Sequence, residues 1–112
     1  MSMNELQAEI GEWGDSNFGP EVDVVVLKNK LRGEVDELDL ALASSGNTRS
    51  DAVEDEAADV AIYLLRLAYR LGFSLLFAVV RKMIVNRARK WPRDRSIPDV
   101  VPARLWCWPD PT

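Results

Sequence analysis

The chain has 112 residues, of which 47% are hydrophobic, and it contains one cysteine and no histidine. A length of this order predicts one domain, and one cysteine excludes an internal disulfide, which fits a reducing cytoplasm. The 18 acidic and 14 basic residues give a formal net charge of −4, and they are unevenly distributed along the chain.

Neither a secretory signal nor a membrane span is expected. The first ten residues have no basic region followed by an apolar one. The longest apolar stretch, residues 60–80, is interrupted by Arg66, Arg70 and Gly72. We therefore expect a cytoplasmic protein. Because a domain this small buries only about two thirds of its unfolded surface, the apolar content favours a homo-oligomer.

The first half of the chain predicts two helices. Residues 3–13 are expected to form a short helix, followed by a turn-rich loop over residues 14–20. Residues 21–44 are expected to form a long helix, which the Ser-, Gly- and Asn-containing segment 44–48 ends.

The second half predicts two further helices and a tail. A third helix is expected to begin at a Ser50 or Asp51 cap and to end before Gly72. Ser74 is predicted to cap a fourth helix that ends near residue 90, before Pro92. No strand alternation is present, so the sequence predicts an all-α helical bundle over residues 1–92. The Pro- and Trp-rich tail, residues 93–112, is expected to be extended and irregular.

Two pairs of acids lie on faces that are otherwise apolar. The pairs are Glu34/Glu37 and Glu56/Asp59, each with i, i+3 spacing. Glu34 lies three residues after Leu31 and four before Leu38, which places it on the apolar stripe of the second helix. Glu56 has the same spacing from Val53 and Val60 in the third helix. Because buried carboxylates are costly unless they are paired or bind metal, these residues predict a cation between the two helices.

The chain composition restricts which cation fits. Without histidine, and with its one cysteine at residue 107, the chain does not supply the usual zinc ligands or the Glu-x-x-His motif of di-iron bundles. An all-oxygen ligand set favours Mg²⁺ or Mn²⁺, with Ca²⁺ as a further alternative. Since Mg²⁺ is often completed by substrate phosphates, the site indicates phosphate chemistry.

The charge distribution agrees with a metal-bound polyphosphate as the ligand. Residues 34–59 hold nine acids and one base, whereas residues 81–95 hold seven bases and one acid. The acidic zone suits a cation and the basic zone suits an anion. The basic stretch alone would also fit a nucleic acid, but the acidic zone would repel a duplex, so no nucleic-acid partner is expected.

Three segments in this order resemble the all-α NTP pyrophosphatase superfamily, which includes MazG, dimeric dUTPases and dCTP pyrophosphatases. The sequence G-E-V-D-E-L at residues 33–38 and E-A-A-D-V-A-I-Y at residues 56–63 are similar to its E-x-x-E and E-x-x-D motifs. The sequence K-M-I-V-N-R-A-R at residues 82–89 is similar to its K-x-x-x-N-x-x-[RK] segment. The resemblance covers roughly residues 13–92. Gly33 stands where many members have a second Glu, and the dCTP pyrophosphatase branch tolerates Gly there.

The resemblance implies a MazG-like four-helix core that is completed by oligomerisation, as a homodimer or homotetramer. It also implies hydrolysis of a nucleoside triphosphate, between the α and β phosphates, to a monophosphate and pyrophosphate. Such an enzyme would remove damaged or surplus dNTPs. The implied metal ligands for Mg²⁺, or for Mn²⁺, are Glu34, Glu37, Glu56 and Asp59.

The remaining site residues are chosen from their positions in the sequence, Glu37 because it lies toward the edge of its apolar stripe. With no histidine, the general base is a carboxylate, for which we choose Glu37, or a hydroxide on the metal. Lys82 is assigned a catalytic, phosphate-binding role together with Arg89. Asn86 is expected to bind the base or sugar. Three aromatic residues are expected to line the nucleotide pocket: Tyr63, Trp13 and Phe18.

Two other interpretations remain open. One is a non-catalytic module that binds metal or nucleotide and has kept the fold, which Gly33 and the unusual tail allow. The other is a helical oligomerisation or regulatory partner whose acidic and basic zones pair between subunits. For each acid pair taken alone, a solvated acidic face is the simpler explanation.

Overall fold

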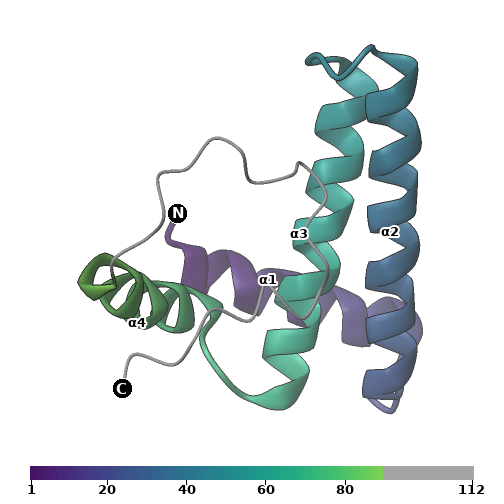
Figure 1. Ribbon diagram of the computed structural model, residues 1–112. Helices are drawn as coiled ribbons and strands as arrows, with labels where there is room; N and C mark the ends of the chain where they lie inside the picture. The colour runs from purple at the N-terminus through teal and green to yellow at the C-terminus, as the bar shows by residue number, and fades with distance from the viewer. Residues whose placement is uncertain (90–112) are drawn as a thin grey trace. The chain divides into compact units, whose positions relative to one another are not determined.

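A computed structural model describes residues 1–89 and shows four helices with no strand in that range (Figure 1). The helices are α1 (Met3–Phe18), α2 (Val24–Ser44), α3 (Asp51–Leu71) and α4 (Leu75–Ala88). The predicted all-α class is confirmed. The chain divides into two units, residues 1–78 and 79–112, so that α4 begins in the first and continues into the second.

The first helix is longer than the sequence predicted. The expected loop over residues 14–20 is wrong for its first five residues, because α1 continues to Phe18. The Asn17 side chain donates a hydrogen bond to the Trp13 carbonyl at 2.8 Å, within the helix. The helix ends at Gly19, whose positive φ of 90° few other residues adopt and whose N–H bonds the Asp15 carbonyl.

The long helices α2 and α3 pack side by side as an antiparallel hairpin (Figure 1). The second helix begins at Val24 rather than at residue 21, because the Asp23 carboxylate accepts a hydrogen bond from the Val25 N–H at 2.7 Å and so caps it. The third helix has the predicted bounds. Its ends are the Ser50 cap, which accepts from the Val53 N–H at 3.1 Å, and the left-handed Gly72.

The core of the first unit lies where α1 and α2 pack against α3. Its fully buried apolar side chains are Leu27, Leu65 and Ala68. Two buried glycines of α1, Gly11 and Gly14, allow close approach of α3 side chains.

Arg70 of α3 bonds both α1 and the segment that precedes α2. Its guanidinium donates to the Val22 carbonyl and lies 3.4 Å from the Asp15 carboxylate. These bonds join three parts of the chain that are far apart in sequence, and they lie partly buried.

The start of α4 is held by α1. The Ser74 hydroxyl caps α4 by accepting from the Phe77 N–H at 3.1 Å, as predicted, and donates to the Asn4 side chain at 2.6 Å. The Gln7 amide bonds both the Phe73 carbonyl and the Leu75 N–H. The helix ends at Ala88, two residues before the predicted end. The predicted tail and the domain boundary at residue 92 lie outside the described residues.

Much apolar surface is exposed along the described helices. Examples are Val25, Val35 and Leu40 of α2, Phe77 of α4 and Ile84 beyond it in the same helix. Within residues 1–89, no single helix has both the length and the apolar character needed to cross a membrane. Only α3 and α4 taken together, as a broken pair, reach that length and composition.

Candidate functional site

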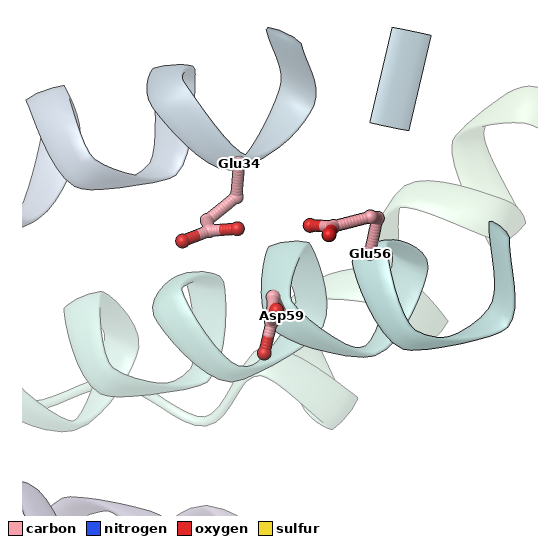
Figure 2. Close-up of side chains that lie close together, drawn as sticks. All are labelled: Glu34, Glu56 and Asp59. Carbon is pink, nitrogen blue, oxygen red and sulfur yellow. The ribbon is translucent and has the colours of Figure 1, made fainter. Parts of the chain in front are cut away.

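Three of the four predicted carboxylates meet between α2 and α3. Glu34 extends from α2 toward Glu56 and Asp59 of α3 (Figure 2). One carboxylate oxygen from each residue lies within 4.8 Å of those of the other two. Because the three oxygens converge from two helices, this arrangement can hold a cation.

Helical spacing explains why these residues face one another. Glu34 lies seven residues after the buried Leu27, so it points toward α3 from the same side of α2. Glu56 and Asp59 are one turn apart on α3 and project toward α2. The apolar stripes predicted buried carboxylates. All three are half-buried instead, so the site is more exposed than predicted. The hairpin is fully buried only nearer α1, around Leu27 and Leu65.

The carboxylates affect one another's ionisation. Burial raises the pKa of the Glu56 carboxyl above its ordinary value of 4.5, and the negative charges of Glu34 and Asp59 raise that pKa further. A hydrogen bond with Glu34 and the charge of Glu37 act in the same direction. Like charges held this close favour either a shared proton or a bound cation. The oxygen-only donor set suits a hard divalent ion such as Mg²⁺ or Mn²⁺.

Glu37, the fourth predicted ligand and the predicted base, lies outside the group of three. Its side chain is exposed at the edge of the site. It lines one groove of about 350 Å³ together with Glu56, and a second groove of about 470 Å³ together with Glu34. Glu37 therefore borders the cluster without joining it.

Two of the predicted aromatic residues line one pocket next to these grooves. Phe18 and Tyr63 face a cavity of about 350 Å³ whose other walls are formed mainly by α2. Trp13 is half exposed and packs edge-on against Phe18, with ring centroids 5.6 Å apart. The pocket shares Val26 and Lys30 with the groove that contains Glu34, so an aromatic pocket adjoins the carboxylate cluster.

A comparison with known proteins identifies relatives of this chain. The dATP/dGTP diphosphohydrolase of Cyanophage S-2L is 37% identical over 91 residues, which are 80% of this chain and 77% of that protein. The chain belongs to the family of this diphosphohydrolase.

A second relative in the diphosphohydrolase family is much longer. The dATP/dGTP diphosphohydrolase of Salmonella phage PMBT28 is 36% identical over 89 residues. The matched part is 80% of this chain but only 28% of that protein. No protein-family model matches the chain, and no solved structure matches it significantly.

Three predicted nucleotide contacts lie in a different unit from the carboxylates: Lys82 and Arg89 for the phosphates and Asn86 for the base or sugar. Lys82 and Asn86 lie in the second half of α4, and Arg89 follows its end. All three belong to the unit of residues 79–112, whereas the cluster belongs to residues 1–78. Contact between them and a nucleotide at the cluster therefore stays a prediction.

Sequence reasoning missed two basic residues, one in the groove that contains Glu34 and one in the adjoining aromatic pocket. Lys30 lies one turn before Glu34 on α2, and this i, i+4 spacing was a usable signal. Arg66 lines the aromatic pocket from α3. It lies seven residues after Asp59, but its position inside a long apolar run concealed it.

Proposed function

We propose that this chain is a Mg²⁺-dependent nucleoside triphosphate pyrophosphohydrolase of the MazG-like type. It hydrolyses a dNTP to the dNMP and pyrophosphate, with dATP and dGTP as the first substrates to test. The observation that carries the proposal is the convergence of Glu34, Glu56 and Asp59 on one point between α2 and α3. The names of the two phage relatives support the substrate class.

The cluster supplies the metal site in this proposal. Glu34, Glu56 and Asp59 would hold the divalent ion, with Glu37 as a fourth ligand or as the base. A bound Mg²⁺, or Mn²⁺ in its place, offsets the negative charge on the triphosphate oxygens. Without that charge compensation, three carboxylates would repel the substrate.

The other residues bind the substrate and move its protons. Glu37 takes a proton from the attacking water as the oxygen of that water bonds to phosphorus and the α–β bridge breaks. Lys82 and Arg89 bind phosphate oxygens, and Asn86 binds the base or sugar. Tyr63, Phe18 and Trp13 pack against the nucleoside. Removing damaged or surplus dNTPs in the cytoplasm is the role that this reaction suits.

The test is a panel of dNTPs incubated with the purified full chain and Mg²⁺, with the phosphate product identified. We expect pyrophosphate and the monophosphate. Release of orthophosphate alone, or no release from any nucleotide, would reject the proposal and favour a non-catalytic binding module.

A matched pair of variants tests the site itself. Glu56→Ala removes a cluster carboxylate, and we expect at least on the order of a 100-fold loss of activity, because even outer-shell partners of a metal cost 10- to 100-fold. Asp55→Ala removes the neighbouring exposed acid of α3 and should keep nearly full activity. Equal activities of the two variants would place the reaction elsewhere.

We also propose that the active form is a homodimer or homotetramer. The exposed apolar side chains of α2, among them Val35 and Leu40, support self-association.

A further inference from the structure

Arg66 is a buried cation whose contacts are unlike those of the structural arginine one turn later. It is only 7% exposed, and its guanidinium lies 5.0 Å from the Phe18 ring centroid and 5.4 Å from that of Tyr63. Among residues 1–89, no carboxylate or carbonyl forms an ion pair or hydrogen bond with it. Arg70, by contrast, bonds the Asp15 carboxylate and the Val22 carbonyl.

The backbone makes room for this arginine. A Cβ atom placed on Gly14 would lie 2.6 Å from the Arg66 Nε, so only glycine fits there while the guanidinium keeps its position. Its contacts with the two aromatic rings leave the N–H donors of this guanidinium available for hydrogen bonds. A ligand in the pocket with hydrogen-bond acceptors would accept these bonds.

The pocket that Arg66 lines has the properties of a small-molecule site. Its volume is about 350 Å³, and apolar and aromatic side chains form its walls. Pockets of this size with few polar groups are typical ligand sites, and the polar groups set their specificity. Arg66 and Lys30 are the two charged residues of its lining within residues 1–89.

The place of the pocket fits the base of a nucleotide rather than its phosphates. Arg66 lies seven residues after Asp59, on the same face of α3 and roughly 10 Å along the helix. Lys30 lies between the two, because it lines both the pocket and the groove that contains Glu34. A nucleotide with its phosphates at the carboxylates thus extends its base toward Arg66.

We propose that Arg66 reads the N7 and O6 acceptors of a purine base bound in this pocket. The inference rests on the proposed function for the substrate class. The arginine fork matches N7 and O6 of guanine with two hydrogen bonds, whereas adenine offers N7 beside an amino donor. Arg66 is therefore a specificity-determining residue that favours dGTP over dATP.

The test compares ligands that differ at one atom. Binding of dGMP and 7-deaza-dGMP, which are not consumed, is measured by calorimetry with the full chain and Mg²⁺, and KM is measured with the triphosphates. The 7-deaza base lacks the N7 acceptor. We expect the wild-type chain to bind dGMP on the order of 10-fold more tightly. Equal affinities would overturn the inference without requiring any variant.

Variants then assign the discrimination to Arg66. Arg66→Met, which has no hydrogen-bond donor, should bind both ligands equally and raise KM for dGTP more than for dATP, and Gly14→Ala, which displaces the guanidinium, should act in the same direction. Arg49→Met changes an exposed arginine of the α2–α3 loop and should keep the preference. If Arg66→Met keeps it too, the inference is wrong.

The outcomes also separate this inference from the proposed function. A chain that releases no pyrophosphate but still distinguishes dGMP from its 7-deaza analogue lacks the activity and keeps the Arg66 role. A chain that releases pyrophosphate from both dGTP and 7-deaza-dGTP with the same KM keeps the activity and loses the Arg66 role. A chain that releases no pyrophosphate and binds neither purine overturns both.

Discussion

Ionisation of Glu56 is disfavoured by its surroundings in the cluster. Burial and the charges of Glu34 and Asp59 raise the pKa of its carboxyl above the ordinary value. A raised carboxyl pKa in the folded state means that ionisation of the group opposes folding. Its contribution to stability is therefore complete below pH 4.5 and is lost as the pH rises through the raised folded pKa.

The first prediction follows from this loss of stability when Glu56 ionises. Glu56→Gln removes one negative charge from the cluster, so the metal-free variant should have a higher Tm than the metal-free wild type at pH 7. The difference should shrink toward pH 4, where the wild-type carboxyl is protonated. Thermal unfolding in EDTA over this pH range measures it. A variant with a lower Tm than the wild type at pH 7 would show that repulsion among the carboxylates does not destabilise the fold.

The same variant should respond differently to metal. Mg²⁺ or Mn²⁺ should raise the Tm of the wild type by mass action, and more at pH 7 than at pH 5, because protons compete for the ligands. Glu56→Gln should lose most of this increase. Asp55→Asn, at an exposed neighbouring position, should keep it.

The second prediction concerns Glu37, which borders the cluster. If it is the base, Glu37→Gln should lower kcat by roughly 100- to 10,000-fold and leave the Mn²⁺ affinity within a few fold of that of the wild type. A large loss of metal affinity would instead make it a ligand. Steady-state kinetics and Mn²⁺ titration decide between the two, with the exposed Asp36→Asn as the control.

At the scale of the helices, replacing glycine with alanine should have opposite effects on stability at two positions with different surroundings. A Cβ on Gly11 of α1 would overlap the Tyr69 ring of α3, whereas one on Gly33 of α2 would meet nothing within 4 Å. Gly11→Ala should therefore destabilise the fold by about 1–3 kcal/mol through overpacking. Gly33→Ala should stabilise it by about 0.5–1 kcal/mol through helix propensity. Urea unfolding measures both, and equal signs would contradict this packing of α1 on α3.

The helices with local end signals were the ones that the sequence predicted well. The bounds of α3 follow from Ser50 and Gly72, which are bonded as caps at its two ends. The end of α1 was misjudged because Gly14 and Asn17 usually indicate a loop. Gly14 lies within the helix, and the Arg66 side chain of α3 occupies the space that a larger side chain there would need. This contact joins residues far apart in the sequence, and no local pattern contains it.

The same reasoning explains which site residues were found. Glu34, Glu56 and Asp59 follow from helical spacing alone, because acids on apolar stripes must meet when two helices pack. The exposure of Glu37 depends on the exact rotation of α2 against α3, which a period of 3.6 does not fix. The role of Arg66 depends on its contacts with Phe18 and Tyr63, of which Phe18 is far away in the sequence.

For the whole molecule, the amount of exposed apolar surface predicts that copies of this chain associate into a homo-oligomer. Few side chains are fully buried among residues 1–89, while Leu40 is 62% exposed and Phe77 is 64% exposed. We expect light scattering after size-exclusion chromatography to give the mass of a dimer or a tetramer. A monomer at all concentrations, with no tendency to aggregate, would contradict this prediction.

The carboxylates of the cluster come from both arms of the α2–α3 hairpin. A divalent ion between them would therefore act as a cross-link between the two helices. Amide hydrogens of α2 and α3 near Glu34 and Glu56 should exchange more slowly once Mn²⁺ is added, because local opening must first release the ion. Amides of α1, which contributes no carboxylate to the cluster, should change less. The metal-binding equilibrium would then set both the activity and the rigidity of this hairpin.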